Sequence, residues 1–250
     1  MWTQGAIFAL MLLITTSVTS LVAIYLVAAS PPPLRPSVPY ASRATYVAHV
    51  AFRASVLLLY VVILVVEALG LGVTMLSYYT VWTFALQGVY LVWAIVHQLQ
   101  RQRPSSRQSM YLHSLFDNCL AMSVLVLVVY WSLLYIPKML WYSYIQHGGN
   151  TVLFGIELAS TRRELQTHSI AFVLVFPTLY ACFAWISVDS WLYRKWPYTF
   201  MDLDAPSAPL WYAGIMGGHV VIFGPVWGLS RLKRLAPTAP HSRIKTSNEV

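Results

Sequence analysis

The stretch AHVAFRASVLLLYVVILVVEALG, residues 48–70, is an almost unbroken run of apolar side chains. A bilayer core of about 30 Å is crossed by about 20 consecutive, mostly apolar helical residues, so this run has the length of a membrane span. Other stretches of the chain share its length and character. The sequence therefore predicts an all-α, polytopic membrane helix bundle with seven transmembrane helices, at residues 6–28, 48–70, 80–98, 114–136, 141–160, 168–188 and 209–229.

The composition of the 250-residue chain agrees with this class, because 58% of its residues are hydrophobic and only 10% are charged. A soluble domain would carry about one quarter charged residues. We find no internal repeat, and expect residues 1–230 to form a single integral membrane domain, followed by a basic, disordered cytosolic tail over 231–250. The first segment lacks the basic start of a signal peptide and is read as a retained helix; if it is cleaved, six helices remain.

The basic residues predict the orientation of the bundle. The net charge is +8, but no basic patch is interleaved with aromatic residues on one face, so nucleic acid is not an expected partner. Seven helices place Lys138, Arg194 and Lys195 on one side. The other side holds the remaining 13 basic residues: Arg35, Arg43, Arg53, Arg101, Arg103, Arg107, Arg162, Arg163, Arg231, Lys233, Arg234, Arg243 and Lys245. By the positive-inside rule the C-terminus is cytosolic, in the plasma membrane or an internal membrane.

Two of the predicted helices carry their polar side chains on one face. Residues that share a helix face recur at steps of three and four. In helix 80–98 these positions hold Thr80, Thr83, Gln87 and Tyr90. In helix 141–160 an arc of about 120° holds His147, Asn150, Thr151 and Glu157. Such stripes are expected to face each other or a watery cavity, since polar groups are costly against lipid.

The chain direction brings part of these stripes to one depth. Both helices enter from the outer side, so Thr80 and His147 lie in the same leaflet, close to Glu67 and to the loop that carries Asp202. A threonine hydroxyl needs an adjacent general base to act as a nucleophile, and histidine suits that role. The sequence therefore favours a Thr80–His147 pair. Thr83, one turn further on the same face, is an alternative nucleophile.

Structural interpretations exist for the same residues. Thr80 and Gln87 could serve as hydrogen-bonding contacts between helices, and Gly148 and Gly149 could permit close packing or expose backbone amides. His168 is expected in a structural charge network with Arg162, Arg163, Glu164 and Glu157. His219 is interpreted as a satisfied core residue, and His49, His97, His113 and His241 are expected to be solvated. No metal-ligand spacing is present, so neither a metal nor another cofactor is expected.

Three blocks together resemble a known family. They are SYYTVWTFALQGVYL (77–91), QHGGNTVLFGIE (146–157) and WPYTFMD (196–202). Their order and spacing are similar to those of the androgen-induced and androgen-dependent multipass membrane proteins, threonine hydrolases of branched fatty-acid esters. The resemblance spans roughly residues 75–225. It implies Thr80 as the nucleophile and His147 as its base, and places the family's acidic residue and following histidine on Glu157 and His168.

The resemblance also has a departure. Asn150 stands where the androgen-induced members have a second histidine, which is similar to the Rolling stone-like branch that is linked to cell fusion. We expect an intramembrane hydrolase of lipid esters, with Asn150, Gln87, Gly148, Gly149 or Asp202 as candidates to bind the oxyanion or the substrate. Its expected partner is a membrane lipid ester. The alternatives are a non-catalytic membrane interaction protein, and a transporter that relays protons through Glu67, Glu157, His168 and His219.

Overall fold

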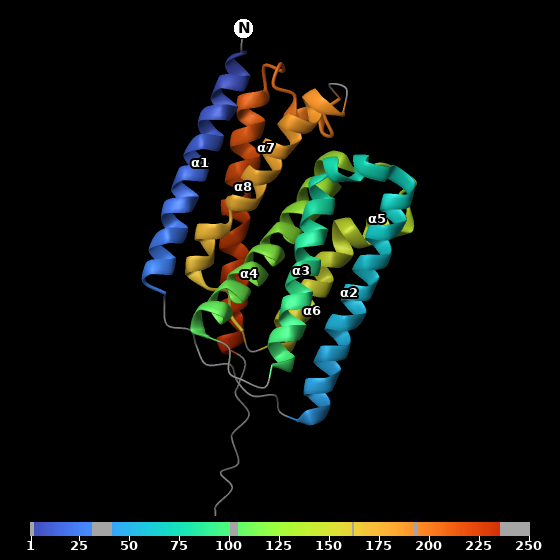
Figure 1. The fold of residues 1–250 in the computed structure, drawn as a ribbon, viewed down its shortest axis with the longest axis vertical. Helices are drawn as coiled ribbons and strands as arrows, with labels where there is room; N and C mark the ends of the chain where they lie inside the picture. Colours follow the sequence, from blue (N-terminus) through green and yellow to red (C-terminus); the bar gives the residue numbers. More distant parts are fainter. Residues whose placement is uncertain (1–2, 32–41, 101–104, 162, 193–194, 236–250) are drawn as a thin grey trace, which may run out of the picture.

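The computed structural model describes residues 3–31, 42–100, 105–161, 163–192 and 195–235, and the regular structure within these ranges is entirely helical (Figure 1). Its α-helices are α1 (Gln4–Ala29), α2 (Arg43–Leu71), α3 (Tyr79–Leu99), α4 (Ser106–Val129), α5 (Trp141–Tyr144), α6 (Asn150–Ser160), α7 (Val175–Ser190) and α8 (Ala208–Arg231). Short 3-10 helices join or extend them: η1 (Gly72–Ser77), η4 (Thr167–Phe172), η5 (Thr199–Met201) and η6 (Leu232–Leu235). Two further segments, η2 (Tyr130–Leu134) and η3 (Ile145–Gly149), are π-helical.

The predicted all-α membrane bundle is confirmed. Within the described ranges, six helical segments are long and apolar enough to cross a membrane: Gln4–Ala29, Arg43–Ser77, Tyr79–Leu99, Arg107–Leu134, Thr167–Ser190 and Ala208–Arg231. The predicted fifth span, 141–160, is built from α5, η3 and α6 in direct succession. Figure 1 shows that α1 and α3 both run downward from their upper ends in this view, and that α8 ends toward the lower end of the bundle. The cytosolic location of that lower end stays a prediction.

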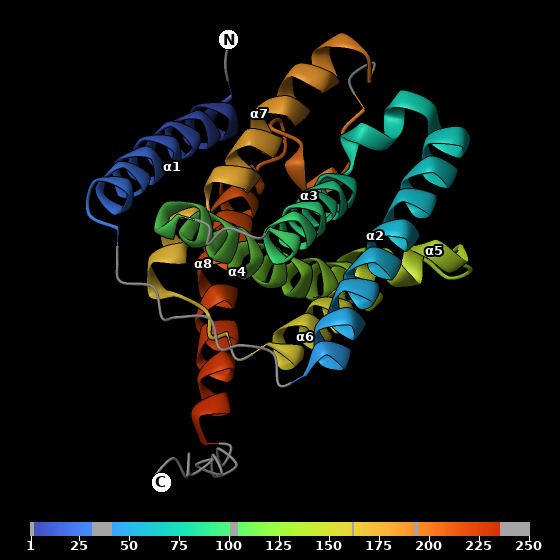
Figure 2. The ribbon, with the colours of Figure 1, turned by 60° about the horizontal axis from the view of Figure 1, so that its bottom comes forward.

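The bundle is organised around α4, which contacts α3, α6 and α8. Figure 2 shows α1 on the outside, next to the α7 and α8 side of the bundle. Large apolar side chains such as Leu58, Val65 and Leu69 on α2 are exposed, as expected for surfaces that meet lipid tails. The core, in contrast, contains polar groups, and Thr83 and Gln87 are fully buried.

Capping side chains decide where several helices begin. Ser42 forms a capping box with Thr45, so α2 starts at Arg43 and not at residue 48 as predicted from hydropathy. Ser105 and Gln108 form a second capping box at the start of α4. At the other end of the chain, Arg231 is the last residue of α8 and the predicted tail continues into η6. Residues 236–250 lie outside the described residues.

Candidate functional site

A cavity of about 530 Å³ opens at the end of the bundle where α3 and α5 begin. Its wall is formed by the last turns of α2, the first turn of α3, the second half of α4, the segment from α5 to η3, and parts of α7, η5 and α8. Most of the lining side chains are apolar or aromatic. We call this space the Thr80 cavity. Its size and character are those of a site for a small, largely apolar ligand.

Thr80 and His147 meet on the wall of this cavity. Oγ1 of Thr80 lies 3.4 Å from Nε2 of His147, and both residues line the cavity. Nδ1 of His147 lies 2.8 Å from the carbonyl oxygen of Ser143, which can only accept a hydrogen bond. We therefore assign the ring proton to Nδ1, which leaves the lone pair of Nε2 directed at the Thr80 hydroxyl. The neutral ring is in the tautomer that a general base requires.

Two π-helical segments meet at the imidazole ring of His147. His147 lies in the π-helical η3, and the π-helical η2 of the neighbouring chain segment contributes Tyr130, whose ring stacks on the imidazole at a centroid distance of 3.6 Å. Trp131, also in η2, donates its indole N–H to the carbonyl of His147 over 2.9 Å. Short π segments are rare and occur frequently at functional sites. Here the two of them hold one imidazole in place.

The first turn of α3 supplies hydrogen-bond donors beside Thr80. Helix amides at this position have no partner within the helix and carry the positive end of the helix dipole. The Tyr198 hydroxyl accepts the amide of Tyr79 over 3.1 Å and lies against the side chain and amide of Thr80. Burial raises the pKa of Tyr198 to about 12, so its proton is retained at neutral pH. These groups can stabilise a negative charge that forms next to the threonine.

Tyr198 was not among the site residues expected from the sequence. It lies in the WPYTFMD block, which was singled out only as an aromatic segment that precedes the last helix. The block indicated that the segment is of interest, but a loop residue has no helical periodicity from which its direction could be inferred. Its position beside Thr80 follows from the packing of η5 against α3 and α7.

Other residues of the two predicted stripes do not reach the cavity. Thr83 is fully buried, and its hydroxyl donates to the carbonyl of Tyr79 over 3.1 Å. The Gln87 amide donates to the carbonyl of Cys119, and the Asn150 side chain accepts the amide of Thr151. None of the three lines the Thr80 cavity. The geometry thus separates Thr80 from Thr83, and places Gln87 and Asn150 in the helix packing.

The remaining oxyanion and substrate candidates also lie off the cavity wall. A β-carbon on Gly148 would lie 3.6 Å from Leu127, and one on Gly149 would lie 3.5 Å from Ile145; both are ordinary van der Waals distances, so close packing does not require glycine at either position. Asp202 ends η5 and accepts the amide of Asp204 over 3.0 Å. The carboxyl group that does line the cavity belongs to Glu67.

A second histidine lines the same cavity. His219 on α8 is buried, with Nδ1 2.8 Å from the carbonyl of Ile215 and Nε2 2.7 Å from the hydroxyl of Tyr79. It is a satisfied core histidine, as its sequence context indicated. Because Tyr79 and Thr80 are consecutive residues, His219 and His147 approach the start of α3 through neighbouring hydroxyl groups.

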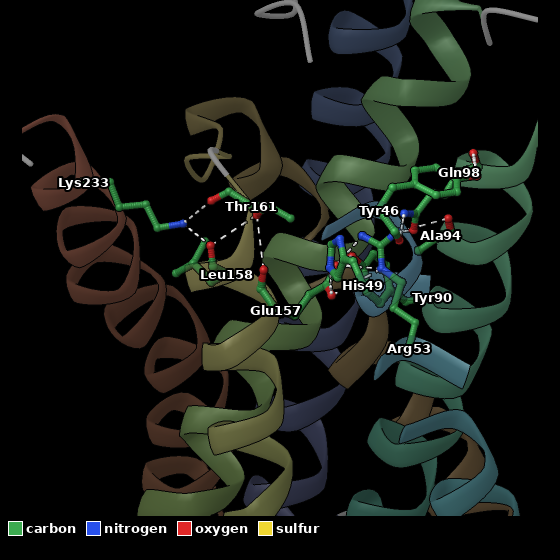
Figure 3. A network of polar contacts seen from close by, with 10 residues as sticks. All are labelled: Tyr46, His49, Arg53, Tyr90, Ala94, Gln98, Glu157, Leu158, Thr161 and Lys233. Atoms are coloured by element: carbon green, nitrogen blue, oxygen red, sulfur yellow. Dashed lines mark hydrogen bonds and ion pairs between the residues drawn. The ribbon is translucent and has the colours of Figure 1, made fainter. Parts of the chain in front are cut away.

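Glu157 belongs to a different polar centre, shown in Figure 3. Its carboxylate accepts hydrogen bonds from Arg53 (Nε, 3.0 Å) and Tyr90 (2.7 Å), and lies 2.8 Å from Nε2 of His49. We call these four residues the Glu157 cluster. All four are buried, so the expectation that His49 is solvated is wrong. The reason is that α2 begins five residues earlier than expected, which places His49 well inside the helix.

His168 is not in this cluster. It lies half-buried in η4, and its Nε2 has no hydrogen-bond partner among the described residues. Glu164 pairs with Arg231 at 3.7 Å, and Arg162 lies outside the described residues.

Three other histidines were also expected to be solvated. His97 contacts Ser109 at 3.2 Å, and Nδ1 of His113 is buried. His241 lies outside the described residues. Over the described part of the chain, no group of three or more His, Cys, Asp or Glu side chains could hold a metal ion.

Comparison with known proteins places these features in a family. The family model described as FAR-17a/AIG1-like protein matches residues 74–224. This is more than half of the chain, so the chain belongs to the FAR-17a/AIG1-like family, which confirms the resemblance to the androgen-induced proteins. The matched region contains Thr80, His147 and Tyr198 and leaves out α1 and nearly all of the α2–η1 segment. No curated protein and no solved structure matches the chain.

Proposed function

We propose that this FAR-17a/AIG1-like protein is an intramembrane hydrolase of fatty-acid esters, with Thr80 as the nucleophile and His147 as the general base. The observation that carries the proposal is the contact between the Thr80 hydroxyl and the free ring nitrogen of His147 on the wall of a cavity. The distance of 3.4 Å is longer than the roughly 2.6–3.2 Å of a working hydrogen bond. Such contacts commonly shorten once substrate is bound.

The reaction would proceed in two halves. Thr80 Oγ1 attacks the ester carbonyl carbon while Nε2 of His147 takes the hydroxyl proton. The tetrahedral oxyanion lies toward the start of α3, where the Thr80 amide and the Tyr198 phenol can stabilise it. The bond to the alkoxy oxygen then breaks, and His147 returns the proton to the leaving alcohol. Water attacks the acyl-threonine with the same histidine as base, which releases the fatty acid and restores Thr80.

The surroundings of the pair suit a lipid substrate. Apolar side chains of α4, α7 and α8 form much of the cavity wall, and the outer surfaces of the helices are apolar. An amphiphilic ester that enters sideways from the bilayer would keep its acyl chain in an apolar environment throughout. The cavity lies at the end of the bundle, so water can reach the acyl-threonine.

The test is covalent labelling by a fluorophosphonate probe, which traps activated hydroxyl nucleophiles. The full chain in detergent is compared with Thr80→Ala, His147→Ala and Thr83→Ala at matched amounts of folded protein. Thr83 is the matched control, because it lies one turn away on the same helix face but points into the packed core. We expect labelling in the wild type and Thr83→Ala and its loss in the other two variants.

Two outcomes would contradict the proposal. Absence of labelling in the folded wild type would favour the non-catalytic interaction protein, in which the polar stripes only join helices. Labelling that survives in Thr80→Ala would place the nucleophile elsewhere. The transporter alternative has less support from the geometry. Glu67 and His219 line the Thr80 cavity, whereas Glu157 is enclosed by its own hydrogen bonds and His168 lies in η4.

A further inference from the structure

The start of α1 lies against the segment that joins α7 to α8 (Figure 1). The hydroxyl of Thr3 donates to the carbonyl of Leu203 over 2.8 Å. A β-carbon on Gly5 would lie only 2.7 Å from the same carbonyl oxygen and 3.1 Å from the β-carbon of Ala208. A side chain at position 5 would have to displace backbone, so this close approach requires glycine. Two residues of α1 and its cap thus define the contact: one supplies a hydrogen bond and the other leaves room for it.

Leu203 ends a stretch that forms part of the cavity wall. We call residues 198–203 the Tyr198 segment. Tyr198, Phe200 and Met201 line the Thr80 cavity, and the rings of Tyr198 and Phe200 stack at a centroid distance of 5.2 Å. The amide of Met201 donates to the carbonyl of Tyr198 over 3.0 Å and closes a turn within the segment. A displacement of the Leu203 carbonyl is therefore transmitted to Tyr198.

The Tyr198 segment is attached to three helices. At α3, the Tyr198 hydroxyl accepts the amide of Tyr79 over 3.1 Å and lies against Thr80. At α8, the hydroxyl of Tyr212 donates to the carbonyl of Met201 over 3.1 Å. The third attachment is the one to α1, which lies outside residues 74–224, the part that matches the family.

α1 is packed against its neighbours along its length. It contacts α7, α8 and η4, with Ala9 and Leu13 buried and the hydroxyls of Thr16 and Thr178 3.2 Å apart. A clash at Gly5 would therefore fall on the Tyr198 segment more than on the helix. Misplacement of a group at a reacting centre by about 1 Å can lower a rate by about a hundredfold.

From these contacts we infer that Gly5 and Thr3 are positioning residues for the reaction. Through Leu203 they hold the Tyr198 hydroxyl beside Thr80, where it stabilises the oxyanion. This inference rests on the proposed hydrolase function. Neither residue lines the Thr80 cavity, so their effect on the rate is exerted through Tyr198.

The experiment measures the rate of fluorophosphonate labelling of the full chain in detergent over a range of probe concentrations. We expect Gly5→Ala to lower the maximal labelling rate about tenfold and to leave the half-saturating probe concentration within about twofold of the wild type. A loss of folded protein would reduce the amount of labelled chain but not the rate constant. The rate constant thus separates positioning from a general loss of stability.

Two further comparisons sharpen this test. Gly214→Ala is the matched control, because it makes the same substitution on α8 where a β-carbon meets nothing within 4 Å, and it should label at the wild-type rate. Thr3→Val removes the donor to Leu203 and should lower the maximal rate a few-fold, while Thr3→Ser retains the hydroxyl and should restore it. The Thr3 pair decides the question if Gly5→Ala folds poorly.

A double-mutant cycle identifies the route of the effect. In the Tyr198→Phe background the hydroxyl that α1 positions is absent. We therefore expect Gly5→Ala to slow labelling no further in this background, within about twofold, because two changes that act through one group are not additive.

The outcomes separate the two proposals. A wild-type maximal rate in folded Gly5→Ala, or a tenfold slowing that persists in the Tyr198→Phe background, overturns the positioning role, while Thr80 stands as the nucleophile. Absence of labelling in the folded wild type rejects the hydrolase itself, and the positioning role with it.

Discussion

The Thr80 cavity and the Glu157 cluster are two polar centres built from the same helical segments, and they differ in how completely their groups are paired. In the Glu157 cluster, the carboxylate contacts His49, Arg53 and Tyr90, and Arg53 also bonds to Gln98 at 2.6 Å. In the cavity, the Thr80 hydroxyl meets His147 at the long distance of 3.4 Å, beside open space. Complete pairing in a dry core fixes structure, whereas incomplete pairing next to a cavity leaves groups available to a substrate.

The comparison predicts that changes at Thr80 affect chemistry without affecting the fold. Thr80→Val retains the shape of the side chain and removes the hydroxyl, so labelling and hydrolysis should fall by at least about a thousandfold while thermal stability in detergent changes little. Thr80→Ser should keep activity within an order of magnitude. If Thr80→Val unfolded the protein as strongly as it lowered activity, the threonine would belong with the structural centre.

Changes in the Glu157 cluster should act in the opposite way. Arg53→Met leaves the Glu157 carboxylate without its main ionic partner, and breaking a buried pair costs about 3–5 kcal/mol of folding stability. We expect a marked drop in the unfolding midpoint in detergent. The double variant Arg53→Met with Glu157→Met should recover much of that loss, because a buried pair replaced by apolar groups is often tolerated. A single variant that unfolds like the wild type would contradict this interpretation.

Tyr198 combines both kinds of contact, because its hydroxyl lies beside Thr80 and also bonds to the amide of Tyr79. Tyr198→Phe removes the phenol beside Thr80 and should lower the rate of hydrolysis about a hundredfold, the usual cost of one oxyanion donor. Stability should fall by only about 1 kcal/mol for the lost contact with the Tyr79 amide. The matched control is Tyr135→Phe, at an exposed position, for which kcat/KM should be unchanged. An unaltered rate in Tyr198→Phe would leave oxyanion binding to the backbone alone.

The smallest effect is expected at Trp131. Its indole donates to the carbonyl of His147, and Trp131→Phe removes this bond while it keeps an aromatic ring. One neutral hydrogen bond contributes about 1 kcal/mol, so the labelling rate should fall a few-fold. The pseudo-first-order rate of fluorophosphonate labelling measures this directly. A rate equal to that of the wild type would show that the stacking on Tyr130 and the bond to the Ser143 carbonyl hold the imidazole without this indole.

The Thr80–His147 contact could be predicted by combining two rules. Hydropathy and helix direction give the depth of each residue in the membrane, and helical periodicity gives the face of the helix on which it lies. Both rules act on single helices and need no knowledge of neighbours. The same rules could not separate Thr83 from Thr80, since both lie on one face. Only the packing of α3 shows that Thr83 points at the core and donates to its own helix.

The partners of Glu157 could not be predicted, for two physical reasons. The hydropathy pattern of α2 begins near residue 48, but the capping box at Ser42 starts the helix at Arg43. His49 and Arg53 were therefore placed near a solvated end when they lie within the helix. In addition, the pairing joins residues that are 108 and 104 positions apart in the chain, and it depends on how α2 packs against α6. No local pattern encodes such a pairing.

The π-helical segment at Ile145–Gly149 has one more consequence. A π turn is equivalent to one residue inserted into an α-helix, and one residue advances a helix by 100°. Gln146 and His147 lie within this segment and Glu157 follows it in α6, so the inserted residue rotates the part of the span that lines the cavity relative to the part that carries Glu157. Deletion of Gly149 would restore a regular helix and rotate His147 away from Thr80, while Glu157 kept its partners. The gain or loss of a single residue in this span can thus change the orientation of His147 toward Thr80 without changing that of Glu157 toward its partners.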